Sequence, residues 1–261
     1  MALNGKNIVI VGGTSGMGLS ACHACIEAGA KVSTFGRNAE KVERAKKVLG
    51  SQAVVAVGDA TDPNMVSSMI DRFVTEQGII HGLYHVAGGS GRSMGDAPLH
   101  EVTDEGWYKT IELNLTSMFY SNRAAVQQFR RQKTCGSILN MGSVLGFSPS
   151  SHYFGTLAYA TAKSAIIGMT KSSASFYADQ GIRFNVIAPA LVDTPMAERA
   201  STDQKIMQYI QTKQPLDGGR IGLPSDLNQA VVFFLSDASK FVTGQVLAVD
   251  GGWSISEGQY L

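Results

Sequence analysis

The feature that most constrains this chain is the alternation of strand-like and helix-like segments from one end to the other. Short runs rich in β-branched and other apolar residues lie at about 7–11, 32–35, 53–57, 82–86, 137–140, 183–188 and 245–249. Segments with helical spacing of apolar residues lie between them, at about 16–28, 38–49, 64–77, 104–132, 157–179 and 225–235. Apolar strands separated by helices predict a parallel sheet that is covered on both faces.

The same pattern predicts a single domain. A length of 261 residues suits one large domain or two small ones. Because no linker, repeat or low-complexity tract interrupts the alternation, we expect one doubly wound α/β domain over residues 1–261, with a mostly parallel, seven-stranded sheet. The segment at about 189–223 is rich in proline and glycine, and we expect it to be a substrate lid. A plain structural connection is the alternative.

A glycine-rich turn joins the first strand to the first helix. Its sequence is Gly12-Gly13-Thr14-Ser15-Gly16-Met17-Gly18. Without side chains the backbone can turn tightly, and a pyrophosphate can approach the free N–H groups and the positive dipole end of the helix. At the first strand–helix junction of an alternating chain, this turn predicts a Rossmann-type dinucleotide site.

The end of the second strand predicts which dinucleotide is bound. A carboxylate there would accept hydrogen bonds from the adenosine ribose and repel a 2′-phosphate. The sequence instead places Arg37 after Phe35-Gly36, and a guanidinium can pair with a phosphate in bidentate fashion. NADP(H) is therefore favoured over NAD(H), which stays the alternative if Arg37 is only a solvated charge.

A tyrosine and a lysine in the second half of the chain form a candidate proton-transfer pair. Tyr159 and Lys163 are four residues apart in a helical segment, so they share one face. A free phenol has a pKa of about 10, and a nearby ammonium favours the phenolate. Such a tyrosine can exchange a proton with an alcohol or ketone while a nicotinamide exchanges the hydride.

With these motifs in place, the chain resembles the short-chain dehydrogenase/reductase family over Lys6 to Trp253, in its compact branch of about this length. The matching positions are Gly12, Gly16 and Gly18 of the glycine turn, Asp59, Asn114, Ser143, Tyr159, Lys163, Pro189-Ala190, Asp193-Thr194-Pro195, Val242-Thr243-Gly244-Gln245 and Val249-Asp250-Gly251-Gly252. Val11 replaces the threonine that usually precedes the turn.

The resemblance implies a role for each matched residue. Tyr159 is the general acid in reduction and the general base in oxidation, and Lys163 lowers its pKa and binds the nicotinamide ribose. Ser143 orients the carbonyl, and Asn114 supports a water chain that resupplies the proton. The residues expected to bind the dinucleotide are Gly12, Thr14, Ser15, Gly16, Met17, Gly18, Arg37, Asp59, Ala60, Ala87, Gly88, Gly89, Tyr159, Lys163, Pro189, Val192 and Thr194.

Two departures from the family pattern affect the site. The stretch after the fourth strand reads His85-Val86-Ala87-Gly88, so both asparagines of the family's N-N-A-G are replaced. We expect His85 to be a buried histidine with its hydrogen bonds satisfied; a histidine that lines the cleft is the alternative. The interval from Ser143 to Tyr159 is longer than usual, and we place the extra residues within 148–154. The substrate contacts we expect are Ser143, His152, Tyr153 and Met196, although the two residues of the insertion could equally lie on an exposed rim.

Composition excludes several other classes of protein. A formal net charge of +1 argues against a nucleic-acid binder or a binder of acidic membranes. No apolar run approaches the roughly 18 residues of a membrane span. Three cysteines do not make a disulfide framework, which favours a cytoplasmic protein, and no ligand spacing predicts a metal. Cys22 and Cys25 form C-x-x-C, which we interpret as two small buried side chains rather than a redox or metal motif.

The expected partners are a small carbonyl or alcohol substrate and further copies of the chain. Charged residues make up 16% of the sequence, below the usual value of about 25%, as expected if other subunits cover part of the surface. The helical segments at 104–132 and 157–179 resemble those through which family members pair, so we expect a homotetramer. Arg130, Arg131 and Lys133 end the first of these segments, where they complement the helix dipole; an acidic carrier protein that delivers the substrate is the alternative.

The sequence thus predicts an NAD(P)-dependent oxidoreductase that interconverts a ketone or aldehyde and a secondary alcohol, and an NADPH-dependent reductase in particular. The alternatives are a dinucleotide-binding regulator without activity, a 3-oxoacyl reductase linked to an acyl carrier, and a sugar-nucleotide epimerase. The last normally needs an added substrate domain, for which the chain is too short. The substrate itself remains open, from a sugar to a steroid.

Overall fold

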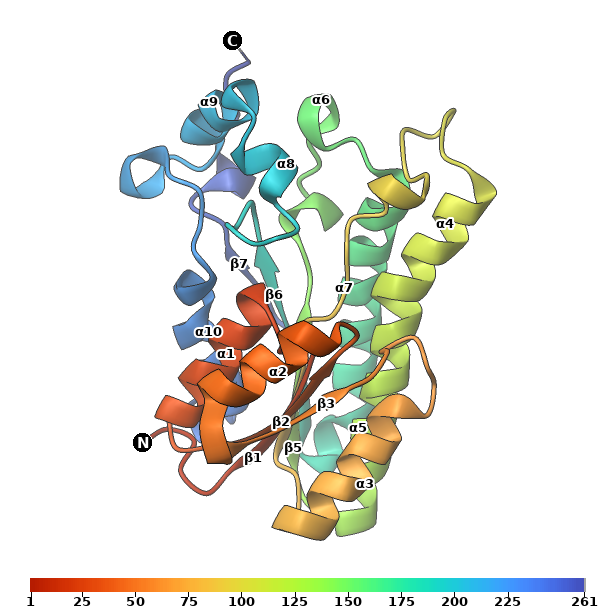
Figure 1. The fold of residues 1–261 in the computed structure, drawn as a ribbon, viewed down its shortest axis with the longest axis vertical. Coiled ribbons are helices and arrows are strands. Elements are labelled where there is room, and N and C mark those ends of the chain that lie inside the picture. Colours follow the sequence, from red (N-terminus) through yellow and green to blue (C-terminus); the bar gives the residue numbers. More distant parts are fainter. Residues whose placement is uncertain (261) are drawn as a thin grey trace.

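A computed structural model describes residues 1–260 and shows a central sheet with helices on both faces (Figure 1). Within these residues the sheet has seven parallel strands in the order β3-β2-β1-β4-β5-β6-β7. Their bounds are β1 (Asn7–Val11), β2 (Lys31–Gly36), β3 (Ala53–Val57), β4 (Gly82–His85), β5 (Gly136–Met141), β6 (Ile182–Pro189) and β7 (Val246–Val249). The predicted doubly wound, Rossmann-type α/β fold is confirmed.

Helices form a layer on each face of the sheet and a group above it. One face carries α1 (Gly16–Glu27), α2 (Ala39–Leu49) and α10 (Asn228–Leu235); the other carries α3 (Met65–Gln77), α5 (Ser117–Gln132) and α7 (Leu157–Tyr177). α4 (Asp104–Ile111) leads into α5, while α6 (Ser151–Phe154), α8 (Glu198–Ser201) and α9 (Gln204–Lys213) lie at the top of Figure 1. The upper group therefore stands beyond the carboxyl ends of the strands.

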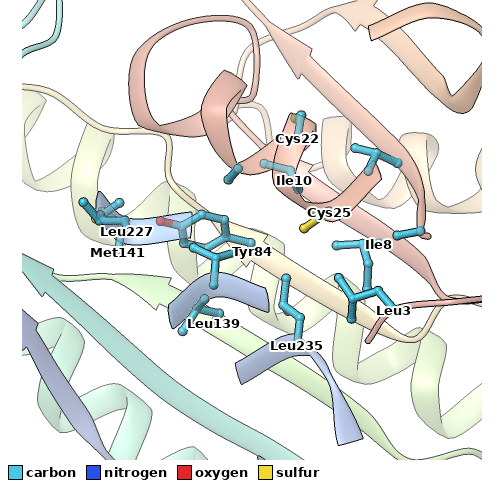
Figure 2. Close-up of a cluster of buried hydrophobic side chains, with 14 of the residues drawn as sticks. Leu3, Ile8, Ile10, Cys22, Cys25, Tyr84, Leu139, Met141, Leu227 and Leu235 are labelled. Carbon is cyan, nitrogen blue, oxygen red and sulfur yellow. The ribbon is translucent and has the colours of Figure 1, made fainter. Parts of the chain in front are cut away.

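The two cores follow from the alternation of side chains along each strand. In β1, Ile8 and Ile10 pack into the core on the α1 side, whereas Val9 and Val11 pack into the core on the α5 side. Figure 2 shows Cys22 and Cys25 within the first core, together with Tyr84. Both thiols are buried and free, and burial raises the pKa of Cys25 to about 12. The interpretation of C-x-x-C as core packing is confirmed.

Two predicted segments differ from the structure. The segment at 104–132 is not one regular α-helix, because a π-helical turn, Glu112–Thr116, separates α4 from α5. The segment at about 189–223 is less irregular than expected, because it contains α8 and α9. Asp203 caps α9 by accepting hydrogen bonds from the N–H groups of Lys205 and Ile206, a local signal that the prolines and glycines nearby obscured.

The strand order also fixes where a ligand can bind. β1 lies between β2 and β4, so the chain winds outward from β1 in one direction and then from β4 in the other. At such a reversal the connections after the two neighbouring strands diverge and leave a crevice at their carboxyl ends. Both the glycine-rich turn after β1 and the segment after β4 begin at this crevice.

Candidate active site

Two adjoining cavities open at the carboxyl edge of the sheet. The first, called here the glycine cavity, has a volume of about 300 Å³ and is lined by the turn after β1 and by the ends of β2 and β3. The second, called the tyrosine cavity, has a volume of about 340 Å³ and is lined by Tyr159 and by the segments after β4, β5 and β6. The residues that line both are Met17, Val86, Gly88, Thr194 and Met196. The two cavities therefore form one continuous crevice.

The structure brings nearly all of the predicted site residues to this crevice. The glycine cavity is lined by Gly12, Thr14, Ser15, Gly16, Met17, Gly18, Arg37, Asp59, Ala60, Ala87, Gly88, Thr194 and Met196. The tyrosine cavity adds Gly89, Asn114, Ser143, Tyr159, Lys163, Pro189 and Val192. His152 and Tyr153 are the exceptions, because neither lines the glycine cavity or the tyrosine cavity.

Close backbone packing explains the glycines of the turn. Gly12 has a φ of 91°, and a Cβ atom there would lie 2.8 Å from the backbone nitrogen of Ala87. A Cβ atom at Gly18 would lie 2.2 Å from the carbonyl oxygen of Gly12. Within residues 1–260 the side chain of Ser15 makes no capping hydrogen bond at the start of α1, so N–H groups of the first turn stay available. The turn is thus shaped to hold an anion such as a pyrophosphate.

Two cations lie where the glycine cavity meets the end of β2. Arg37 lines the cavity as predicted, and Lys41 in α2 lines it too. The N–H of Lys41 donates to the Asn38 side chain, which caps α2. Asp59, at the end of β3, accepts hydrogen bonds from the N–H and the hydroxyl of Thr61 at 2.9 Å each. Sequence reasoning missed Lys41, although its place in the first turn of the helix after Arg37 was a usable signal.

The first turns of α7 carry the tyrosine and the lysine into the second cavity. The Lys163 ammonium lies 5.4 Å from the centroid of the Tyr159 ring and donates to the carbonyl of Met141 at 2.9 Å. Lys163 is 2% exposed. Ser143, which follows β5, accepts a hydrogen bond from the N–H of Leu145 and is hydrogen-bonded to Tyr159.

Burial controls the charges of this pair. Burial raises the pKa of Tyr159 above its ordinary value, and the hydrogen bond with Ser143 opposes the rise. Burial also lowers the pKa of Lys163 to about 7. The expected net lowering of the tyrosine pKa by Lys163 is therefore not found. The physical reason is that desolvation disfavours both charged forms, and an amine with a pKa of about 7 is only partly charged at neutral pH.

Asn114 sits inside the π-helical turn between α4 and α5. Its side chain donates to the carbonyls of Gly89 and Thr110 at 2.9 Å each and accepts from the N–H of Gly89 at 3.1 Å. The side chain is fully buried. The bond to Thr110 spans four residues within this turn, and π-helical turns are frequent at functional sites. Asn114 thereby fixes the segment after β4 against the helices.

His85, at the end of β4, also contacts the segment after β4, through the carbonyl of Ala87. It is fully buried, its Nδ1 lies 2.7 Å from the Ser121 hydroxyl, and its Nε2 lies 3.1 Å from the carbonyl of Ala87. Because a carbonyl only accepts, Nε2 carries the proton. Burial, with a smaller contribution from the charge of Lys163, lowers the pKa of His85 to about 3. The prediction of a buried, satisfied histidine is confirmed.

Asp96 anchors the start of α7, and sequence reasoning missed it. Its carboxylate oxygens accept hydrogen bonds from the N–H groups of Ala158 at 2.8 Å and Tyr159 at 2.9 Å. These amides belong to the first turn of α7 and have no partner within the helix. No local signal reveals this contact, because Asp96 lies 62 residues before Ala158. Asp96 therefore positions the helix that carries Tyr159.

The insertion before α7 forms a wall behind the tyrosine cavity. His152 and Tyr153 lie in α6 and contact other aromatic rings rather than the cavity: the Tyr153 ring is 5.4 Å from Tyr209, and the His152 ring is 5.1 Å from Tyr260. Tyr209 and Tyr260 stack at 4.8 Å with an angle of 8°. Aromatic packing therefore engages two of the four side chains that were expected to contact substrate, whereas Ser143 and Met196 line the cavity.

Two other kinds of feature are absent from residues 1–260. No group of three or more His, Cys, Asp and Glu side chains in this part of the chain could hold a metal ion. No helix there is long and apolar enough to cross a membrane.

Comparison with a family model matches most of the chain. The model is described as enoyl-(acyl carrier protein) reductase and matches residues 11–254. This range includes the glycine turn, Asn114, Ser143, Tyr159 and Lys163.

Two curated relatives cover almost the whole chain. The chain is 32% identical over 248 residues to cis-4-hydroxycyclohexanecarboxylate dehydrogenase of Sinomonas cyclohexanicum, covering 94% of this chain and 95% of that protein. It is 33% identical over 251 residues to a 3-oxoacyl-(acyl-carrier-protein) reductase of Chlamydia trachomatis, covering 95% and 96%.

Two solved structures share the fold. A short-chain type dehydrogenase/reductase from Mycobacterium ulcerans aligns with a TM-score of 0.90 and 28% identity, covering 99% of this chain and 93% of that one. Levodione reductase aligns with a TM-score of 0.86 and 27% identity, covering 97% and 98%.

Proposed function

Because this chain belongs to the short-chain dehydrogenase/reductase family, we propose that it is an NADPH-dependent reductase of a small ketone or aldehyde, with Tyr159 as the proton donor. The family makes it an oxidoreductase that acts on CH–OH groups and uses a nicotinamide dinucleotide. The observation that carries the finer proposal is the meeting of Tyr159, Ser143 and Lys163 in a cavity that opens into the glycine cavity.

The glycine cavity fits a dinucleotide. A Cβ atom at Gly16 would contact Thr194 at 3.3 Å, so the turn after β1 and the segment after β6 face one another across a narrow space. Gly12, Thr14, Ser15, Gly16 and Gly18 would hold the pyrophosphate, Asp59 and Ala60 the adenosine, and Gly89, Lys163, Pro189, Val192 and Thr194 the nicotinamide end. When bound, the reduced nicotinamide supplies the hydride.

The residues around Tyr159 would handle the proton. The Ser143 hydroxyl donates to the carbonyl oxygen of the substrate and orients it, while the Tyr159 hydroxyl gives that oxygen its proton as the alcohol forms. A raised tyrosine pKa keeps this donor protonated at neutral pH, which favours reduction over oxidation. The Lys163 ammonium and the water chain that Asn114 supports would then restore the proton.

Removing the hydroxyl group of Tyr159 tests this proposal. Tyr159→Phe removes the proton donor, so we expect kcat for carbonyl reduction to fall by about 10²-fold or more. The dissociation constant for NADPH should stay nearly constant. Tyr153→Phe is the matched control, because Tyr153 does not line the cavity. If Tyr159→Phe keeps wild-type turnover, Tyr159 is not the donor. A wild-type protein that binds NADPH but reduces no carbonyl compound would instead be a regulator.

The preference for NADPH rests on Arg37 and Lys41, the two cations at the end of β2. Hydrogen bonds to charged groups contribute about 1.5–3 kcal/mol, so Arg37→Asp should shift the ratio of NADPH to NADH affinity toward NADH by about tenfold or more. An unchanged ratio would mean that Arg37 does not contact a 2′-phosphate. NAD(H) would then be the better assignment.

A small cyclic or acyl carbonyl compound is the substrate we favour. The cavity volume of about 340 Å³ suits a ligand of this size. The relatives named above act on a hydroxycyclohexanecarboxylate and on a 3-oxoacyl group. The second candidate is therefore a 3-oxoacyl thioester on a carrier. The basic cluster at the end of α5 gives it little support, because Arg131 forms an ion pair with Asp71 at 3.1 Å and a hydrogen bond with Gln128. Turnover of an acetoacetyl thioester would favour the carrier.

We also propose the assembly, the lid and the location. Phe119 in α5 and Phe176 in α7 are 44% and 70% exposed, as expected if these helices pack against other copies in a homotetramer. A single sedimenting species of 27.7 kDa would contradict the homotetramer.

Residues 189–223 would act as a lid on the single domain, because Thr194 and Met196 line both cavities. The three cysteines are free, which supports a reducing, cytoplasmic location.

A further inference from the structure

Two guanidinium groups meet at the mouth of the tyrosine cavity. Arg92 donates from Nη2 to the carbonyl oxygen of Tyr153 at 3.0 Å, and Arg199 donates from Nη2 to the same oxygen at 3.1 Å. Both arginines line the cavity that holds Tyr159, and both are exposed to solvent. They come from segments far apart in the chain, the turn after β4 and α8. The fold therefore brings two positive charges to one neutral acceptor, the carbonyl oxygen of Tyr153.

Neither guanidinium is neutralised within residues 1–260. No carboxylate forms an ion pair with Arg92 or Arg199 there, whereas Arg220 pairs with both Asp217 and Asp226. The nearby carboxylate of Asp96 is engaged by the amides of α7. Burial and then the charge of Arg199 lower the pKa of Arg92, and Asp96 opposes this effect. The two like charges thus act on one another, and an anion between them would relieve the repulsion.

The rest of the cavity complements this charged mouth. Its wall is largely apolar, with Val144, Leu145, Phe154, Leu191 and Trp253 among the lining residues. The polar atoms that would handle the reacting oxygen belong to Ser143 and Tyr159. An apolar body with a carbonyl near Tyr159 and an anionic group at the mouth would contact all three parts of the cavity.

We propose that Arg92 and Arg199 form a subsite for an anionic group of the substrate, a carboxylate or a phosphate carried on the carbonyl compound. This inference rests on the proposed reductase function. Guanidinium groups bind both anions through paired, charge-assisted hydrogen bonds, so the shared chemistry is a group with two or more anionic oxygens. A substrate body with its own carboxylate and a carrier arm with a phosphate are the two sources of such a group.

Matched pairs of substrates test the subsite. The first pair is 4-oxocyclohexanecarboxylate and its methyl ester, and the second is 3-oxobutyl phosphate and 4-hydroxybutan-2-one. We expect kcat/KM for the anionic member to exceed that of its neutral partner by about tenfold or more in at least one pair, mainly through KM. The pair with the larger ratio identifies the source of the anion. The ratio should fall as ionic strength rises, since the subsite is open to solvent.

Variants then test whether the two arginines cause the difference in kcat/KM between the anionic and the neutral substrate. Arg92→Gln and Arg199→Gln should each lower the anion-to-neutral ratio by about tenfold, and Arg→Lys at either position should retain part of it. Arg44→Gln in α2 is the control, because Arg44 is exposed and lines neither cavity. A purely structural role, anchoring the Tyr153 carbonyl, would lower melting temperature and slow both members of a pair equally.

The outcomes separate this inference from the proposed function. If the neutral compounds are reduced as well as the anionic ones, the subsite is overturned while the reductase stands. If no compound is reduced, calorimetric titration of the NADPH-saturated protein with 4-oxocyclohexanecarboxylate and with 3-oxobutyl phosphate still tests the subsite. Binding of either compound that both glutamine variants weaken would support it, and binding that neither variant changes would overturn it.

Discussion

The glycine cavity and the tyrosine cavity are neighbours built on opposite principles. The glycine cavity is shaped by backbone, because a single added carbon at Gly12 or Gly18 would meet backbone atoms at 2.8 or 2.2 Å. The tyrosine cavity is shaped by side chains from separate segments: the turn after β4, the loop after β5, α7 and α8. The first has one shape that local sequence dictates, whereas the second can change with any of its side chains.

This difference teaches where each kind of specificity resides. Backbone N–H groups at a helix start recognise any pyrophosphate, so a fixed backbone suits a cofactor that does not vary. Aromatic rings and arginines at a cavity mouth recognise a particular body and charge. A small core of Val144, Ala200, Ile206, Tyr209, Ile210 and Trp253 holds these side chains together beyond the sheet. The part of the tyrosine cavity that lies beyond the sheet therefore has a packing core of its own.

The largest expected effect comes from adding one carbon to the glycine cavity. In Gly18→Ala the new Cβ clashes with the carbonyl of Gly12, so we expect a loss of about 3 kcal/mol in the free energy of unfolding. The turn would open, and NADPH affinity should fall by about 100-fold. Denaturant unfolding and fluorescence titration measure the two effects.

A second helical glycine supplies the control. Gly168 lies in α7, is exposed and would meet nothing within 4 Å in Gly168→Ala. Alanine is the better helix former, so stability should rise by up to about 1 kcal/mol. Wild-type NADPH affinity in Gly18→Ala would contradict the view that backbone alone shapes this cavity.

The next largest effect is a pH dependence of stability that arises from His85. This residue contacts Ala87 near the junction of the two cavities. The folded-state pKa of about 3 lies below the ordinary value of 6.5. Between these values the unfolded chain takes up a proton that the folded chain refuses, so stability falls as pH falls. For His85 alone, this difference in proton binding lowers the free energy of unfolding by about 2.5 kcal/mol between pH 6.5 and pH 4.5.

Chemical denaturation at several pH values measures this slope. His85→Asn should remove the histidine's share of it, because asparagine does not titrate. His100→Asn, which changes an exposed histidine, should keep the wild-type slope. Equal slopes in all three proteins would mean that His85 is protonated in the folded state as readily as in the unfolded state.

Sequence reasoning succeeded where the contacts are local or where the family pattern supplied them. The strands, the glycine turn and the pairing of Tyr159 with Lys163 follow from spacing over a few residues, and the structure places them as expected. The π-helical turn that carries Asn114 was not predicted, and the side chain of Asn114 bonds to Gly89, 25 residues away in the chain.

The tyrosine cavity shows why the rest could not be predicted. Arg92 and Arg199 are 107 positions apart by number, yet both reach the carbonyl of Tyr153, and no periodicity encodes such a meeting. The rings of His152 and Tyr153 were expected at the substrate because their position in the chain is near Tyr159. In the structure they pack against Tyr260 and Tyr209 instead, and these tertiary contacts are not evident from the sequence alone.

A smaller effect is expected from Asp96, the anchor of α7. Asp96→Asn keeps an acceptor but loses the charge and one of the two hydrogen bonds to α7, which should cost about 1–2 kcal/mol. Because Tyr159 then moves relative to Ser143, kcat should fall by about tenfold at constant NADPH affinity.

Asp203→Ala is the control, since it removes the oxygen that accepts hydrogen bonds from Lys205 and Ile206 and caps α9, far from Tyr159 in the chain. It should cost about 1 kcal/mol of stability and keep kcat. If Asp96→Asn and Asp203→Ala lower kcat equally, Asp96 acts on overall stability rather than on the position of Tyr159.

The smallest expected effect separates the two cavities most cleanly. Tyr260 stacks on Tyr209 of α9 and contacts His152 of α6, so its ring joins α9 to the helix whose Phe154 lines the tyrosine cavity, and it does not line the glycine cavity. Tyr260→Ala should remove about 1 kcal/mol of packing and raise KM for the carbonyl substrate by about threefold. NADPH affinity should not change. Phe241→Ala, which truncates a ring that is 99% exposed, should alter neither constant. An equal change in both constants for Tyr260→Ala would show that the two cavities are mechanically one, because loosening the aromatic wall would then have reached the backbone turn after β1.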